Sequence, residues 1–450
     1  MSANAALHDG RGTRKQIVSW CLWDFGSNAY NTVMLSFVFS VYVTTAAAPD
    51  KATGQQIYAN AQTIAGIVVA VLAPMIGVWA DRAQRRRRML TFSTLLVVAS
   101  MALCWFVLPY EEQHGLKYLY LGVALIALAN MFQQVAEIFY YSMLVDISTP
   151  QNVGRISGAG WGLGYLGGVI MLAGTLFLFV LDGGFLGVPE EQAMNYRAIA
   201  LFCAAWLLIM SVPVMIWGPK DAPVRGENAR IGVIEAYRQV GRHLRRVWSQ
   251  RRHVLHFLAA SAVYRDGLAA VFAFAGVIAG TAYGMEQTQI IVFGLAANLV
   301  AAIGSWLLGL ADDKLGPRVV ILFSLVMMVT LGLVILAIPT VAVFWVGGLG
   351  ISSLVGAVQS ASRTLLTRVI EPGEENEMFG LYNTVGRAAS WIAPSLIALF
   401  TFWFDQRLGL LGIVVTLGLG LALFWPLRID GVTHNRSGSG VGGDGEASST

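Results

Sequence analysis

A short polar motif occurs twice in this chain, each time directly after a long apolar stretch. Both copies read Gly-x-x-x-Asp-(Arg/Lys), are followed by basic residues, and lead into a new apolar stretch. The shared positions are Gly77, Asp81 and Arg82 in the first copy, and Gly309, Asp313 and Lys314 in the second. A duplicated loop at matching points of two hydrophobic halves indicates a membrane protein built from repeats, which is the plan of a transporter and not of an enzyme.

The composition is also that of a membrane protein. Hydrophobic residues make up 56% of the 450 residues and charged residues only 12%, whereas a soluble domain carries about 25% charged residues. The net charge is +4, but the basic residues lie in short loops between apolar stretches. That distribution sets the orientation of a membrane protein and does not indicate a nucleic-acid partner.

The apolar stretches predict twelve membrane-spanning helices, because a hydrocarbon core about 30 Å thick needs roughly 20 apolar residues per helix. We expect an all-α membrane protein with two pseudo-symmetric bundles of six helices. The first six spans are expected near 17–45, 58–80, 89–109, 117–144, 155–181 and 198–217. The second six are expected near 254–282, 287–310, 318–338, 341–369, 379–403 and 407–427.

Polar segments divide the chain into five parts. We expect a cytoplasmic N-terminus at 1–16, bundles at 17–217 and 254–427, a basic cytoplasmic linker at 218–253, and a disordered cytoplasmic tail at 428–450. From Ile231 to Trp248 the linker has the apolar spacing of a helix with arginines beside it, which suits a helix lying on an anionic membrane face.

The sequence gives no sign of an enzyme, a cofactor or a metal site. It has no nucleotide-binding loop of the Gly-x-x-x-x-Gly-Lys-(Ser/Thr) type. The histidines lie outside the spans or at the edge of one (His256), so no Ser/His/Asp constellation is indicated. The three cysteines lie inside apolar stretches at no metal-binding spacing. The remaining energy source is a gradient, and a buried carboxylate can carry a proton.

The duplicated motif together with two sets of six spans resembles the major facilitator superfamily over roughly 17–427. Within it the chain is similar to the autophagy-related vacuolar effluxer family and its bacterial relatives. The matching stretches begin at Trp23, Phe139, Ser157, Tyr264, Gln359 and Phe379 and read WDFGSNAY, FYYSMLVD, SGAGWGLGYLGG, YRDG, QSASR and FGLY. The resemblance implies export of amino acids from a storage compartment in fungi, and a central cavity lined by the first, fourth, seventh and tenth helices.

Ionisable residues inside a span are costly, so each is a candidate for a functional site. They are Asp24 in the first span, Glu137 in the fourth, Arg265 and Asp266 in the seventh, Arg363 in the tenth and Arg387 in the eleventh. Helical spacing extends them into polar stripes, with Asn28 and Asn31 beside Asp24, Gln134 and Tyr141 beside Glu137, and Gln359 beside Arg363. Such stripes face water or protein and not lipid.

Two roles remain open for these residues. In the first role, the ionisable residues of the first, fourth, seventh and tenth spans contact substrate or a proton. In the second, they pair with one another as a gate or as structural ion pairs. For Arg387 the gate or structural role is favoured, because in the superfamily the eleventh helix is usually a supporting one. Asp81 and Asp313 lie at span ends, where a carboxylate can hold a facing helix N-terminus in one state and release it in the other. We therefore expect the motif residues to act as a latch.

The predicted function is secondary active transport of a small polar organic solute. An arginine can bind a substrate carboxylate, and Asp24 or Glu137 can bind an ammonium group or a proton. This division suits an amino acid or a related zwitterion, with proton coupling. The alternatives are an exporter of another small organic or drug-like compound, and a receptor or scaffold membrane protein without transport activity. We expect a monomer in a bacterial inner (plasma) membrane, with both termini in the cytoplasm.

The orientation gives a first prediction. A cysteine placed within 225–250 should be labelled only from the cytoplasmic side, because nine lysines and arginines cluster in 218–253. The measurement is labelling by an impermeant thiol reagent in intact cells and in inverted vesicles. Labelling in intact cells would contradict the orientation.

Overall fold

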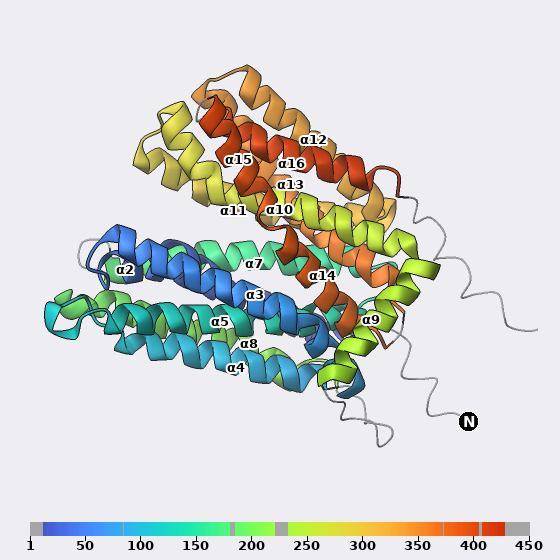
Figure 1. Ribbon diagram of the computed structural model, residues 1–450, viewed down its shortest axis with the longest axis horizontal. Helices are drawn as coiled ribbons and strands as arrows, with labels where there is room; N and C mark the ends of the chain where they lie inside the picture. Colours follow the sequence, from blue (N-terminus) through green and yellow to red (C-terminus); the bar gives the residue numbers. More distant parts are fainter. Residues whose placement is uncertain are drawn as a thin grey trace, which may run out of the picture.

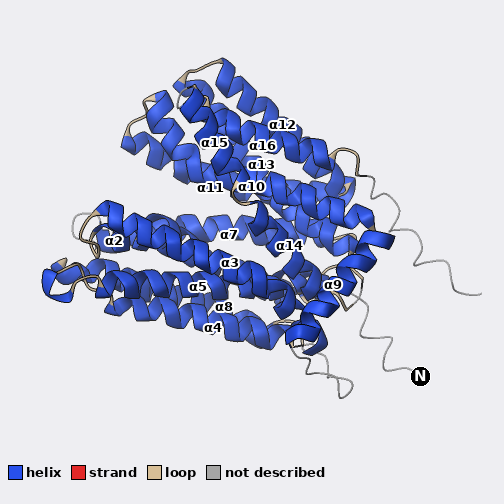
Figure 2. Ribbon diagram, viewed as in Figure 1, coloured by secondary structure: helices blue, strands red, loops and turns tan. Residues whose placement is uncertain are grey.

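The computed structural model describes residues 12–83, 85–180, 185–220, 233–371, 373–404 and 407–427. Within these ranges the chain forms helices joined by turns, and no strand (Figure 2). The expected tail at 428–450 and most of the expected N-terminal segment lie outside the described residues.

The helices follow one another with short connections. The first half contains α1 (Arg14–Asn28), the π-helix η1 (Ala29–Phe37), α2 (Phe39–Thr45), α3 (Lys51–Ala83), α4 (Arg86–Leu103), α5 (Lys117–Ser142), α6 (Leu144–Ile147), α7 (Val153–Thr175) and α8 (Met194–Trp217). Between the halves lies α9 (Val233–Gln250). The second half contains α10 (Arg252–Tyr283), α11 (Gln287–Leu315), α12 (Pro317–Ala337), α13 (Val341–Val369), α14 (Glu375–Ala389), α15 (Ile392–Trp403) and α16 (Gly409–Phe424).

The all-helical membrane fold predicted from the sequence is confirmed. Among the described residues, ten helical segments are long and apolar enough to cross a bilayer. The helical stretch from Arg14 to Thr45 and the shorter apolar helix α16 add two more passes, which is consistent with twelve. The helix expected at Ile231–Trp248 corresponds to α9.

Several expected spans are not single α-helices; the fifth, for example, ends in the π-helix η4 (Leu176–Val180). The first passes from α1 through the π-helix η1 to α2, with Val38 at the junction. The eleventh is divided into α14 and α15 at Ser390 and Trp391. Pro394 explains the break in the eleventh, because proline lacks the N–H that would bond to the carbonyl of Ser390 in a continuous helix.

The helices form two groups that converge at one end of the molecule (Figure 1). Helices α3, α4, α5 and α8 belong to one group, and α12, α13, α15 and α16 to the other. The groups diverge away from α9 and come together beside it. We call the converging end the α9 end.

Contacts between the halves gather toward the α9 end. Helix α7 packs along α11, and α14 packs along α3. Close to the start of α14, Ser142 Oγ donates to Asn376 Oδ1 at 2.5 Å, and Arg86 pairs with Glu375 at 2.7 Å. These bonds join the last turn of α5 and the first turn of α4 to the second half, so the structure is closed at this end.

Candidate substrate site

The predicted pathway residues come from helices that face each other between the two halves. Asp24 and Asn28 lie on α1, Asn31 on η1, Gln134, Glu137 and Tyr141 on α5, Arg265 and Asp266 on α10, Gln359 and Arg363 on α13, and Arg387 on α14. They do not form one cluster. The contacts of most of them define a group around Arg363 and Asp24, a group around Glu137, and a pair, Arg265 and Asp266, that contacts the second half only.

Arg363 is the most deeply buried of the charged candidates, with 1% of its surface exposed. Its Nη2 donates to the carbonyl oxygen of Ser157 at 2.8 Å, and its Nε donates to Ser157 Oγ at 3.2 Å. Among the described residues, Nη1 has no hydrogen-bond partner. Ser157 is on α7 of the first half, so the first half accepts the hydrogen bonds of a guanidinium that belongs to the second half. One nitrogen of this guanidinium remains able to donate to a ligand.

Four aromatic rings of the first half surround the same guanidinium. Its Cζ lies 5.4 Å from the ring centroid of Trp20, 5.8 Å from Tyr140, 5.0 Å from Tyr141 and 5.2 Å from Trp161. Ring faces attract a cation within about 6 Å. Trp20 and Tyr140 are stacked at 4.3 Å, which fixes their orientation. We refer to these four residues as the aromatic cage.

Asp24 lies at the rim of the aromatic cage. Its Oδ2 accepts a hydrogen bond of 3.1 Å from the hydroxyl of Tyr140. Asn28 lies beside it and donates to the backbone carbonyl of Asp24 at 3.1 Å. No ion pair within 4 Å joins Asp24 to Arg363, although their charges act on each other. A carboxylate of one half and a guanidinium of the other therefore lie near one set of rings without direct contact.

Glu137 makes no described ion pair with an arginine of the other half. Its described hydrogen bond is a long one of 3.5 Å from Gln133. The charges of Arg387, Arg265 and Arg363 act on this carboxyl from beyond ion-pair distance. Glu137 is thus a partly buried carboxyl that faces several cations and is bound by none of them.

The polar stripe of α5 continues away from Glu137 as a row of amides. Gln134 donates to Asn130 at 2.9 Å, and Asn130 donates to Gln62 of α3 at 2.7 Å. Gln134 therefore belongs to a chain of hydrogen bonds that joins α5 to α3 within the first half. The side chains of Asn31 and Gln359 make no described hydrogen bond, and Arg387 is exposed.

Arg265 and Asp266 are turned toward different parts of the second half. The Arg265 guanidinium lies 3.9 Å from the ring centroid of Tyr382 and donates to the carbonyl oxygen of that residue at 3.3 Å. Asp266 is buried, and its Oδ2 accepts the N–H of Ala393 at 2.6 Å. That N–H belongs to the first turn of α15, so Asp266 caps the helix that begins after the break in the eleventh span.

Sequence reasoning missed two residues of the Arg363 group. Trp20 lies four residues before Asp24 on α1, and this helical spacing could have placed it on the same face. Ser157 lies near the start of α7, three residues before Gly160. In the sequence Ser157 belongs only to the stretch that matches the family, because no sequence pattern tells which arginine a serine will contact.

The second motif loop contacts the start of a helix in the other half. Asp313 accepts the N–H of Gly154 at 2.7 Å and that of Arg155 at 3.2 Å, at the N-terminus of α7. Lys314 is exposed. A carboxylate at a helix N-terminus satisfies free N–H groups and interacts favourably with the helix dipole.

The two motif glycines make matching contacts in the two halves. A Cβ on Gly309 would lie 2.8 Å from the carbonyl oxygen of Gly154, at the start of α7. A Cβ on Gly77 would lie 2.6 Å from the carbonyl oxygen of Asn376, at the start of α14. Only glycine allows these approaches. The side chains of Asp81 and Arg82 lie outside the described part of the chain.

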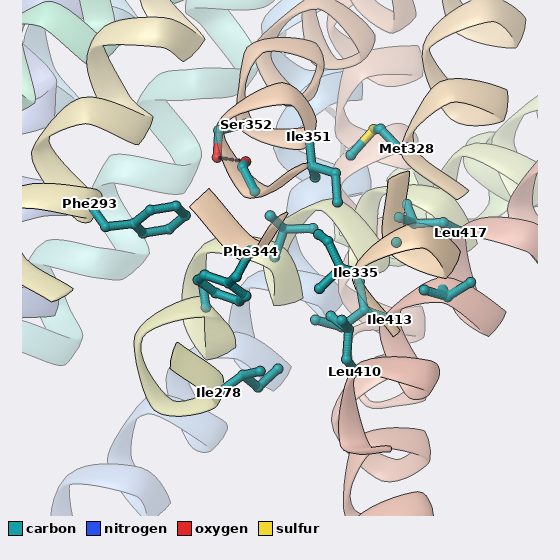
Figure 3. Close-up of a pocket in the computed structure, with 15 residues that line it drawn as sticks. Ile278, Phe293, Met328, Ile335, Phe344, Ile351, Ser352, Leu410, Ile413 and Leu417 are labelled. Atoms are coloured by element: carbon teal, nitrogen blue, oxygen red, sulfur yellow. Dashed lines mark hydrogen bonds between the residues drawn. The ribbon is translucent and has the colours of Figure 1, made fainter. Parts of the chain in front are cut away.

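An apolar cavity of about 40 Å³ lies inside the second half and away from these groups (Figure 3). Its lining comes from α10, α11, α12, α13 and α16 and includes Phe293, Met328, Phe344 and Leu417. Ser352 is its one hydroxyl, and this group donates to the carbonyl of Gly348 at 2.8 Å. A cavity so small and apolar does not suit a polar solute. Among the described residues no group of histidine, cysteine or acidic side chains could hold a metal.

The comparison with protein families gives one matching model. The family described as Vacuole effluxer Atg22 like matches residues 146–431 of this chain. The uncharacterized MFS-type transporter YxiO of Bacillus subtilis is 25% identical over 387 residues, which cover 85% of this chain and 88% of that protein. Autophagy-related protein 22-1 of Aspergillus fumigatus is 24% identical over 273 residues, which cover 55% of this chain but only 43% of the fungal protein.

Solved structures share the fold at low sequence identity. A bacterial homologue of the iron transporter ferroportin in an outward-facing state has a TM-score of 0.69 at 15% identity, covering 92% of this chain and 98% of that one. The proton:xylose symporter XylE has a TM-score of 0.70 at 12% identity, covering 92% and 95%. Both are structures of transporters, and at this identity they show the fold alone.

The contact of Asp313 with α7 gives a prediction for the latch. Asp313→Ala removes both acceptors and should weaken closure at the α9 end by about 0.5–2 kcal/mol, the range for a lost N-terminal cap. Asp313→Asn keeps an acceptor and should have a smaller effect. The measurement is the distance distribution between spin labels on cysteines at Gln151 and Val319, which lie at this end in opposite halves. An unchanged distribution in Asp313→Ala would rule out the latch.

Proposed function

Since the chain belongs to the Vacuole effluxer Atg22 like family of the major facilitator superfamily, we propose that this transporter moves an amino acid or a related zwitterion by alternating access. It is a multi-pass integral membrane protein. The observation that carries the proposal is the position of Arg363 and Asp24. One half supplies a guanidinium with a free Nη1, the other half supplies a carboxylate, and both lie at the same aromatic cage.

The chemistry of these two groups fits the two ends of a zwitterion. The free N–H groups of Arg363 Nη1 can donate to a substrate carboxylate, and charge-assisted hydrogen bonds of this kind are about twice as strong as neutral ones. Asp24 can accept from an ammonium group. Charges buried in a membrane protein are costly unless they are paired, so a solute that carries both charges is favoured over one that carries neither.

Alternating access requires contacts that can be exchanged. The structure is closed at the α9 end through Asp313, Arg86 and Ser142. Rocking of the two halves would break these bonds and open the site to the other side of the membrane. The distribution of basic residues supports an orientation with α9 in the cytoplasm. One chain supplies both sides of the site, which supports a monomeric transporter.

Glu137 is the residue that we propose for proton coupling. It is partly buried, has only a long hydrogen bond, and is influenced by three arginines that lie on the second half. Movement of the halves would change its distance to these cations. The affinity of a carboxyl for a proton depends on such distances, so proton binding and the motion of the halves would be linked.

The test of the substrate class is flux in proteoliposomes. Purified protein loaded with unlabelled amino acids should take up labelled amino acids by counterflow, with saturation. The deaminated acids and the decarboxylated amines of the same side chains should not exchange. The absence of flux with every zwitterion, or equal flux with the amines, would overturn the proposal.

The coupling role of Glu137 gives a separate prediction. Glu137→Gln should abolish gradient-driven accumulation and spare counterflow, because exchange needs no net proton movement. Glu112→Gln changes an exposed carboxyl at the opposite end and is the matched control, which should keep both activities. If Glu137 only holds arginines in place, its loss costs about 3–5 kcal/mol. Loss of both activities with a large fall in melting temperature would then support the structural role.

A further inference from the structure

The aromatic cage is complete within the first half and does not depend on Arg363 for its shape. Trp20 Nε1 donates to the carbonyl oxygen of Tyr140 at 2.8 Å, and the Trp23 ring also stacks on Tyr140 at 4.4 Å. Trp20 and Tyr140 are fully buried. These contacts all lie between α1 and α5, so they persist when α13 moves away.

Without Arg363 the cage has the chemistry of a site for an organic cation. Four rings would surround it within 6 Å, and aromatic rings attract ammonium groups through their quadrupoles. Asp24 at the rim adds a negative charge, and its bond to Tyr140 couples this charge to the cage. The carbonyl oxygen of Ser157, which accepts from Arg363, would be free to accept from a new donor.

We propose that Arg363 and the ammonium group of the substrate occupy this cage in turn. The inference rests on the proposed function, since it names how the same site binds one end of the zwitterion. Arg363 is then the internal occupant of the closed state. The substrate cation replaces it when the halves part at the α9 end.

The position of the cage along the helices ties the exchange to that motion. Ser157 lies in the second turn of α7 and Tyr140 in the last turn of α5, both at the α9 end. Arg363 lies within two turns of the C-terminal end of α13, at the same end of the molecule. Parting of the halves here withdraws the guanidinium, so a ligand of the empty cage binds only the parted state and shifts the population toward it.

The free Nη1 of Arg363 completes the arrangement. As the guanidinium leaves the cage, it can keep a substrate carboxylate on this nitrogen while the ammonium group of the same molecule enters the cage. The zwitterion would then lie between two groups that otherwise contact each other, with its anion on the second half and its cation on the first. Neither half is left with an unpaired buried charge.

The first experiment empties the cage. Arg363→Ala should bind methylguanidinium or ethylammonium with a half-saturating concentration at least tenfold below that of the unmodified protein, read as a rise in melting temperature. Arg318→Ala is the matched control, because Arg318 donates to Trp425 and Leu427 carbonyls and contacts no described ring. Equal affinity in Arg363→Ala and the unmodified protein would overturn the exchange.

The second experiment does not require the variant to fold. In otherwise unmodified protein with spin labels at Gln151→Cys and Val319→Cys, ethylammonium should increase the long-distance population, and acetate should not. An unchanged distribution with ethylammonium would refute the inference. Zwitterion flux without cation binding would leave the proposed function standing and remove the exchange. Cation binding without zwitterion flux would overturn the proposed function together with the exchange by substrate, and would leave a cation site only.

Discussion

The closed end of this transporter depends on how a buried guanidinium is solvated. Arg363 extends from the second half and finds its hydrogen-bond acceptors and its ring faces in the first half. An arginine left alone in such surroundings would cost several kcal/mol. The contact therefore stabilises the closed state only as long as the halves touch. When the halves part, the guanidinium needs new hydrogen-bond acceptors, and the rings and the carbonyl group of the first half need a new cation. A solute with one positive and one negative group meets that requirement, and a solute without charged groups does not.

The duplicated motif has a structural meaning that follows from close backbone approach. Gly77 meets the first turn of α14, and Gly309 meets the first turn of α7. These two helices hold equivalent positions in the two halves, as the fifth and eleventh passes. Any side chain at either glycine would keep the facing helix at a distance. In the second half, the distance would also remove the hydrogen bonds from α7 to Asp313. The glycine contact with a facing helix is thus shared by both repeats, and in the second repeat Asp313 adds hydrogen bonds to that helix.

Hydropathy predicted the fold because the bilayer imposes both the length and the polarity of each span. It did not predict the division of the eleventh span, which depends on Pro394 and on a cap from Asp266 on another helix. Helical spacing placed Glu137 and Arg363 on faces between the halves. Helical spacing could not show which residues contact each other, because the spacing along one helix does not give the rotation or the axial position of the neighbouring helix. Arg363 instead meets Ser157 and four rings, and Asp266 is used by α15, although the sequence offered both as equal candidates for the pathway.

The distribution of polar and apolar contacts separates the moving interface from the rigid one. The cavity in the second half is lined by side chains such as Phe293 and Leu417, whose contacts have no preferred direction. Contacts of that kind hold helices of one half together in every state. The interface at the α9 end instead uses hydrogen bonds and ion pairs, which are lost over a small displacement. An interface of this kind has two discrete arrangements, made or broken, and not a continuous range.

The three guanidinium groups that act on Glu137 all belong to the second half. Each change between the two arrangements therefore moves positive charge relative to the carboxyls of the first half, and a proton or a substrate can offset that change.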